Sequence, residues 1–208
     1  MLEQQVRPSD VLNPRVLEAL KNIARDQFVE DELSGIAYAD TSLPIGYGQV
    51  MLPPVLQGRL LQAIDIQAEE NVLEIGTGTG YLTAILAQLA NHITTVEIVP
   101  ELSATAQNNL EQAAVTNVTF HIGDASHGWP LADRIDVIFT SASFEIIPET
   151  YLQSLTIGGR MLAVVGKGNN MTVQIIRRIA EREWQTDTVF ETSIPAMMNA
   201  EKLPEFKF

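Results

Sequence analysis

The chain has 208 residues, a formal charge of −13 and no cysteine. Its length predicts one domain, spanning 1–208, with a sizeable core. The charge argues against nucleic acid and anionic membranes as partners. The missing cysteine excludes disulfides, thiolate nucleophiles and cysteine metal sites. The first residues lack the apolar core of a signal peptide, and no run approaches the ~20 apolar residues of a membrane span, so we expect a cytoplasmic protein.

The N-terminal region, residues 1–65, reads as helices joined by a loop. Asn13-Pro14 is a cap followed by proline at the first helical position, and a helical apolar stripe follows it. Phe28 and Val29 anchor a second short segment over Arg25–Leu33, and a loop rich in proline and glycine covers 43–49. Pro53-Pro54 then starts another helix. We interpret this region as a helical lid beside a sheet.

From residue 66 to 168 apolar strands alternate with helical patterns. The expected strands are Val72–Ile75, Ile93–Glu97, Val118–Ile122, Ile135–Thr140 and Arg160–Gly166. The expected helices are Tyr81–Ala90, Pro100–Ala113 and Pro148–Leu155. Strands separated by helices of ~10–15 residues predict right-handed βαβ units and a mostly parallel sheet. In residues 169–208, a turn over 166–170 with strands near Met171–Ile179 and Thr188–Ile194 predicts a C-terminal antiparallel hairpin.

The first strand breaks into a loop with glycine at every second position, Glu74-Ile75-Gly76-Thr77-Gly78-Thr79-Gly80-Tyr81. Strand, glycine loop and helix in that order place a backbone against a nucleotide-like ligand. A dinucleotide fingerprint needs its third glycine one residue later, where Tyr81 stands, which argues against a nicotinamide oxidoreductase. A tight turn without a ligand is the alternative for these glycines.

Two acidic residues follow at the next strand ends. Glu97 closes its strand about 20 residues after the glycine loop begins, a position from which a carboxylate accepts hydrogen bonds from both ribose hydroxyls. Gly123-Asp124-Ala125 follows the third strand. Because ligands of such sheets bind beyond the carboxyl ends of strands, these residues and the glycine loop are expected to meet. A surface carboxylate at Glu97 and an Asx turn at Asp124 are the structural alternatives.

The E-x-G-x-G-x-G loop resembles the first motif of S-adenosylmethionine-dependent methyltransferases. Five segments before it, taken in order, resemble the N-terminal region of the protein-L-isoaspartate O-methyltransferases, and the likeness runs to about residue 168. These segments are Gln5-x-Arg7, 15–20, Arg25-x-x-Phe28-Val29, Ala37-Tyr38-x-Asp40 and Pro44-Ile45-Gly46-x-Gly48-Gln49.

The resemblance implies an α/β fold, the Rossmann-like methyltransferase three-layer sandwich, with a mostly parallel seven-stranded sheet, a C-terminal hairpin and N-terminal helices. It also implies S-adenosylmethionine as cofactor and a carboxylate of a protein or peptide as methyl acceptor. Asp124 would bind the adenine amino group and Ala125 would offer a backbone amide. The cofactor-binding residues implied are Glu74, Gly76, Thr77, Gly78, Gly80, Tyr81, Glu97, Ile98, Asp124 and Ala125.

The substrate loop departs from this family. Where relatives read G-Q-T-I-S before a residue and proline, Val50 replaces the threonine and Leu52 the serine. The C-terminal segment from Ile194 also departs from the family's aromatic-proline-leucine ending. The alternative is therefore a divergent paralogue that methylates another acceptor, or only binds the cofactor. Ser141 and Ser143, in a small-residue stretch before a proline-started helix, are further candidates for substrate contact, and the alternative is that they are loop serines whose hydroxyls only stabilise turns.

Methyl transfer to a carboxylate needs no general base, because the acceptor is already ionised. His92, His121 and His127 show no ligand-like spacing and are interpreted as structural or exposed, so no metal site is expected. The sequence leaves the oligomeric state open.

Overall fold

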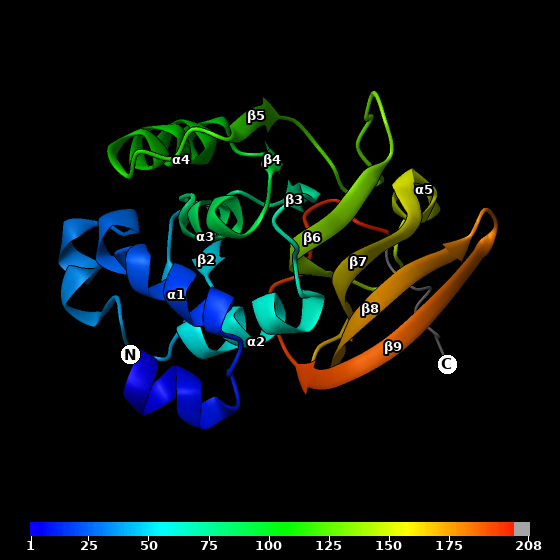
Figure 1. Ribbon diagram of the computed structural model, residues 1–208. Helices are drawn as coiled ribbons and strands as arrows, with labels where there is room; N and C mark the ends of the chain where they lie inside the picture. Colours follow the sequence, from blue (N-terminus) through cyan, green and yellow to red (C-terminus); the bar gives the residue numbers. More distant parts are fainter. Residues whose placement is uncertain (202–208) are drawn as a thin grey trace, which may run out of the picture.

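The computed structural model describes residues 1–201, and residues 202–208, the end of the C-terminal region of hairpin and tail expected over 169–208, lie outside the described residues. A seven-stranded sheet in the order β5-β4-β3-β6-β7-β8-β9 forms the centre (Figure 1). Its strands are β3 (Asn71–Ile75), β4 (His92–Glu97), β5 (Val118–Ile122), β6 (Ile135–Phe144), β7 (Leu155–Lys167), β8 (Asn170–Ala180) and β9 (Glu183–Thr192). Strands β3 to β7 pair in parallel, and β8 and β9 add antiparallel pairings. The predicted fold class is confirmed.

Helices cover both faces of the sheet. They are α1 (Pro14–Asn22), α2 (Pro54–Ile64), α3 (Tyr81–Leu89), α4 (Pro100–Gln112) and α5 (Glu149–Ser154). One core cluster joins alternate sheet residues such as Val72 and Val137 to α1, α2 and α3. The residues that point the other way, such as Leu73 and Ile138, form a second cluster with Tyr151 of α5. The alternation of side chains along each strand thus produces three layers.

The N-terminal region differs in detail from expectation. Helix α1 begins where predicted, because the Asn13 side chain accepts hydrogen bonds from the first backbone amides. The segment expected over Arg25–Leu33 is two short 3₁₀ turns, η3 (Arg25–Phe28) and η4 (Asp31–Ile36). Further helical turns, η1 (Leu2–Val6) and η2 (Arg7–Ser9), precede α1 and were not predicted.

The loop predicted over 43–49 closes a small antiparallel pair, β1 (Leu43–Pro44) with β2 (Val50–Met51). In the turn between them, Gly46, Tyr47 and Gly48 have positive φ angles (87°, 53° and 70°). Glycine adopts such angles without steric strain, and it occupies two of the three positions. This turn brings the chain back toward the sheet, so that Val50 and Leu52 lie at the carboxyl ends of the parallel strands.

Strand β9 begins at Glu183, earlier than the predicted Thr188. Strand β9 lies at the edge of the sheet, and most of its residues are polar and exposed. An apolar pattern therefore could not indicate where the strand begins. Strands β6 and β7 also extend beyond their predicted ends.

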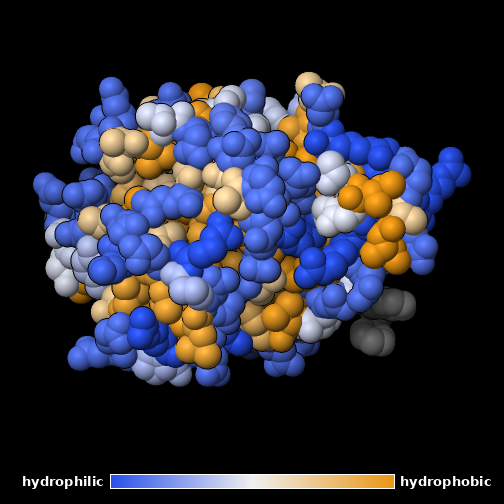
Figure 2. Space-filling model, viewed as in Figure 1, coloured by the Kyte–Doolittle hydropathy of each residue, from blue (hydrophilic) through white to orange (hydrophobic). Residues whose placement is uncertain are grey.

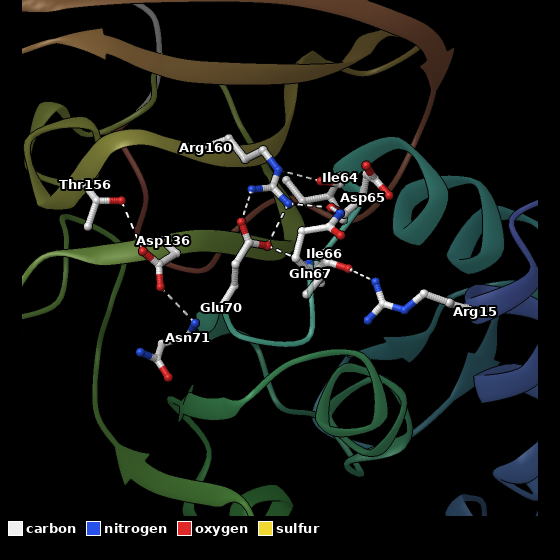
Figure 3. Close-up of polar contacts among 10 residues, drawn as sticks. All are labelled: Arg15, Ile64, Asp65, Ile66, Gln67, Glu70, Asn71, Asp136, Thr156 and Arg160. Atoms are coloured by element: carbon white, nitrogen blue, oxygen red, sulfur yellow. Dashed lines mark hydrogen bonds and ion pairs between the residues drawn. The ribbon is translucent and has the colours of Figure 1, made fainter.

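The amino ends of β3 and β6 are tied to α2 by a polar cluster (Figure 3). Arg160 of β7 donates to the Glu70 carboxylate at 2.6 and 2.9 Å and to the Ile64 carbonyl at 2.6 Å. Asp136 accepts from the Asn71 backbone amide at 3.0 Å. This cluster fixes the end of the sheet opposite the ends at which the candidate residues lie.

Hydrophilic residues cover most of the face shown in Figure 2, with hydrophobic residues in scattered groups. Within residues 1–201, no helix has the length and apolar character needed to cross a membrane.

Candidate active site

A cavity of about 920 Å³, including its open mouth, lies at the carboxyl ends of β3, β4, β5 and β6. The sheet order reverses beside β3, whose neighbours are β4 and β6, and this is where ligands of such sheets bind. The N-terminal segment 45–52 and the C-terminal segment 195–198 complete the wall. The predicted site residues in the lining are Val50, Leu52, Gly76, Thr77, Gly78, Tyr81, Glu97, Ile98, Asp124, Ala125 and Ser141.

The glycine loop uses its three glycines differently. Gly76 and Gly78 line the cavity with φ of 94° and 57°, in the left-handed region that other residues avoid. A Cβ on Gly76 would lie 2.4 Å from Ser141 Oγ. Gly80, at φ 90°, faces α4 instead, where a Cβ would lie 2.3 Å from Leu110 Cδ1. Gly80 is therefore required for packing of α3 against α4.

Glu74 lies beneath the loop and is absent from the cavity lining within the described residues. Its carboxyl group is fully buried, and Oε2 accepts from Thr83 Oγ1 at 2.6 Å and from Thr95 Oγ1 at 2.7 Å. Burial raises the pKa of Glu74 to about 8, an effect that the two hydroxyl hydrogen bonds only partly oppose. A neutral Glu74 at pH 7 supports the loop from below.

Glu97 connects two strand ends. Its Oε2 accepts from the Gly78 backbone amide at 2.9 Å, and its Oε1 accepts from the Val99 amide at 3.0 Å. The side chain is nearly buried but reaches the cavity. A carboxylate has about four acceptor positions, so capacity remains for ligand hydroxyl groups. Glu97 can therefore hold the glycine loop and a ribose at once.

Asp124 forms the Asx turn that was its structural alternative, and it still lines the cavity. Oδ1 accepts from the Ser126 amide at 2.9 Å, and Oδ2 accepts from Asn199 Nδ2 at 2.8 Å. The Ser126 backbone hydrogen bond is the largest cause of the lowered pKa of Asp124, so the carboxylate is ionised at neutral pH. Ala125 follows with its carbonyl accepting from the Tyr151 hydroxyl.

The two serines lie differently from each other. The Ser141 hydroxyl, in the cavity wall, is 2.9 Å from the Gly76 carbonyl and 3.1 Å from the Ile75 carbonyl, so it holds the glycine loop. Ser143 is buried, and its hydroxyl lies 3.3 Å from the Pro195 carbonyl. Ser143 anchors the C-terminal segment and is not among the described residues that line the cavity.

The wall of the cavity beside the substrate loop contains residues that the sequence did not single out. Gln57 of α2 lines the cavity and is bonded to the buried guanidinium of Arg25. A glutamine within an otherwise apolar, buried helix face was the available signal. Met197 and Met198 also line the cavity, although their segment was noted only as a departure from the family's ending.

The histidines lie outside this lining. His92 Nε2 is 2.9 Å from Thr119 Oγ1, His127 Nδ1 is 2.7 Å from Ser126 Oγ, and His121 stacks beside Trp129. Across residues 1–201 no three metal-ligating side chains gather in one place.

Comparison with known proteins gives one consistent family. The family model "Protein-L-isoaspartate(D-aspartate) O-methyltransferase (PCMT)" matches residues 1–200. The protein-L-isoaspartate O-methyltransferase of Magnetococcus marinus is 40% identical over 177 residues, covering 85% of this chain and 78% of the relative. Protein-L-isoaspartate O-methyltransferase 2 of Marinobacter nauticus is 34% identical, covering 98% of this chain and 94% of the relative.

Among solved structures, one from Plasmodium falciparum named for the same enzyme, in complex with S-adenosyl-L-homocysteine, has a TM-score of 0.81. At 16% identity, covering 92% of this chain and 94% of that chain, it supports the fold.

Proposed function

The chain belongs to the protein-L-isoaspartate(D-aspartate) O-methyltransferase family and is an S-adenosylmethionine-dependent methyltransferase, and we propose that its cavity holds both the cofactor and an isoaspartyl carboxylate. The observation that carries this proposal is the convergence of the glycine loop, Glu97 and Asp124 on one cavity, whose opposite wall is the substrate loop. The family model and the relative from Marinobacter nauticus both extend over the part of the chain that contains the substrate loop, and neither supports the divergent alternative.

The residues present fit the cofactor. Gly76 and Gly78 let the backbone approach it, and Glu97 has free acceptor positions for ribose hydroxyls. Asp124 lines the same cavity, and its carboxylate would accept a hydrogen bond from the adenine amino group. The bound cofactor supplies a sulfonium methyl group, which is an electrophile with a good leaving group.

The reaction balances without a proton transfer. With the cofactor bound, a carboxylate oxygen of the acceptor would form a bond to the methyl carbon as the sulfur–methyl bond breaks, and that electron pair would remain on sulfur. The products are a methyl ester and neutral S-adenosylhomocysteine. The chain's contribution is alignment and exclusion of water, worth up to about 7–11 kcal/mol in well-oriented intramolecular reactions. Apolar wall residues such as Val50, Leu52 and Met197 suit that role.

A protein or peptide acceptor fits the surface beside the cavity. A second hollow of about 630 Å³, including its open mouth, shares Leu52 and Pro195 with it. Arg59 there lies over the Phe190 ring, with its Cζ 3.8 Å from the ring centroid. This hollow gives room for residues flanking the acceptor. The proposal includes a cytoplasmic site of action, and cell fractionation tests that part.

The experiment is radiolabelled methyl transfer to an isoaspartyl peptide, with the same peptide containing ordinary aspartate as control. We expect transfer only to the isoaspartyl peptide, and calorimetric binding of S-adenosylhomocysteine. Binding without transfer would favour a cofactor-binding module, and a nicotinamide cofactor in the purified protein would favour an oxidoreductase. The Val50→Thr/Leu52→Ser variant, assayed beside the wild type, measures how much the two absent hydroxyls would change the rate of methyl transfer.

A further inference from the structure

The substrate-loop wall of the cavity carries a buried amide. Gln57 lies in the first turn of α2, five residues after Leu52, and is only 3% exposed. Both residues line the cavity, as does Tyr81 at the start of α3. Burial of an amide is costly unless its hydrogen bonds are made, so the partners of Gln57 are informative.

One partner is Arg25, whose side chain is fully buried. Its Nη1 donates to Gln57 Oε1 at 2.5 Å, Nη2 donates to the Leu52 carbonyl at 2.6 Å, and Nε donates to the Ala37 carbonyl at 2.8 Å. All three acceptors are neutral, and among the described residues no ion pair joins Arg25 to a carboxylate. A guanidinium keeps its proton in proteins, so a cation lies directly behind this wall.

Arg25 fixes which way the amide points. A guanidinium only donates, so Gln57 must turn its oxygen toward it and its Nε2 away. Within residues 1–201 no hydrogen bond uses Gln57 Nε2, and that atom is not among the fully enclosed polar atoms that lack a partner. Nε2 therefore reaches open space, and the open space that Gln57 lines is the cavity.

The position is near the reacting end of the site. The Arg25 Cζ lies 4.8 Å from the centroid of the Tyr81 ring, and Tyr81 follows directly on the glycine loop. A Cβ on Gly78 would lie 3.1 Å from Ile45 Cδ1, so the N-terminal segment also touches that loop. A donor on this wall thus faces a ligand held between the glycine loop and the substrate loop.

We propose that Gln57 binds the carboxylate of the methyl acceptor through Nε2, and that Arg25 is the positioning residue that orients its amide. This inference rests on the proposed function and names a polar contact in place of the hydroxyls absent at Val50 and Leu52. One acceptor oxygen takes the hydrogen bond while the other attacks the methyl carbon. The sulfur–methyl bond breaks with its electron pair on sulfur, and no proton moves, so a neutral amide suffices. The buried Arg25 cation further favours an anionic acceptor.

The test compares Gln57→Leu and Gln57→Glu with Gln62→Leu as matched control. Gln62 lies on the same helix, and its amide instead bonds the chain at Asp10, Leu12 and Asn13. For each variant we measure kcat and KM with the isoaspartyl peptide, the Kd of S-adenosylhomocysteine, and Tm.

We expect Gln57→Leu to lower kcat/KM for the peptide by about 10- to 100-fold, mainly through KM, and to leave the S-adenosylhomocysteine Kd within about twofold. Gln57→Glu lowers kcat/KM further, because one carboxylate oxygen still accepts from Arg25 while the other meets the acceptor carboxylate. Gln62→Leu lowers Tm without a selective rise in peptide KM.

Three outcomes overturn the inference. In the first, Gln57→Leu keeps the wild-type kcat/KM for the peptide. In the second, it weakens binding of S-adenosylhomocysteine by as large a factor as it lowers kcat/KM for the peptide, which would assign the contact to the cofactor. In the third, the wild type binds S-adenosylhomocysteine but never methylates the peptide, and that result alone also refutes the proposed function.

Discussion

Glu74 provides a test of the support beneath the glycine loop. Its carboxyl group is buried on β3, where Thr83 and Thr95 donate to Oε2 while Oε1 lacks a partner among the described residues. Glutamine has nearly the same shape and keeps one acceptor oxygen, but it does not titrate. Glu74→Gln therefore separates the shape of this side chain from its ionisation.

The magnitude follows from the pKa of Glu74, which burial raises from 4.5 to about 8. Between these two values the folded protein keeps a proton that the unfolded chain releases, so stability falls as the pH rises. At about 1.4 kcal/mol per pH unit the loss reaches roughly 5 kcal/mol by pH 8, and above that it levels off. The wild type loses this stability and the Gln variant does not. For a chain of this size the difference corresponds to about 10 °C or more in Tm.

The assay is urea unfolding of the ligand-free protein at pH 5.5 and pH 8.5, with Glu111→Gln, an exposed carboxyl on α4, as control. We expect Glu74→Gln to gain stability relative to the wild type as the pH rises, while Glu111→Gln follows the wild type. If the difference between Glu74→Gln and the wild type is the same at both pH values, Glu74 is not protonated in the folded state and the reasoning is refuted.

Three further substitutions test other parts of the fold and site. Gly80→Ala places a methyl group against Leu110 at a residue with positive φ, and it should lower the free energy of unfolding by about 1–3 kcal/mol. An unchanged midpoint of urea unfolding would contradict the role of Gly80 in packing. Glu97→Ala removes the carboxylate that holds the glycine loop and should raise the Kd of S-adenosylhomocysteine, measured by calorimetry, at least about 10-fold. An unchanged Kd argues against contact between Glu97 and the cofactor. Arg160→Met removes the ion-pair partner of the half-buried Glu70 carboxylate and should lower the free energy of unfolding by about 3 kcal/mol. The same change should leave the Kd of S-adenosylhomocysteine unchanged.

The cofactor side of the site could be predicted because each residue follows from a regular pattern. Glu97 and Asp124 were found by locating strand ends, and parallel strands bring those ends to one edge. Periodicity does not say what else a side chain does. It could not show that Gly80 faces α4, or that Asn199 reaches back to Asp124 across 75 residues of chain.

For the acceptor side of the cavity, the sequence showed only that the substrate loop departs from that of its relatives. Its construction depends on contacts between distant segments that lack regular strands, such as Arg25 with the Leu52 carbonyl and with Gln57. A buried arginine in a short 3₁₀ turn leaves no periodic signal, since its place is determined by tertiary contacts alone. Ser141 was recognised as a candidate, but its bond to the Gly76 carbonyl required the β3–β6 pairing to be known.

The buried Arg25 cation also bears on how a protein with a charge of −13 can accept an anion. Surface carboxylates are screened by salt beyond about 8 Å, whereas a buried charge acts through a medium of lower dielectric constant. The carboxylates of Glu97 and Asp124 lie at the strand ends, on the side proposed for the cationic cofactor. Arg25 lies behind the substrate-loop wall, bonded to Leu52 and Gln57. The positive charge of Arg25 therefore lies on the side of the cavity proposed for the anionic acceptor, which favours binding of a carboxylate there despite the net charge of the chain.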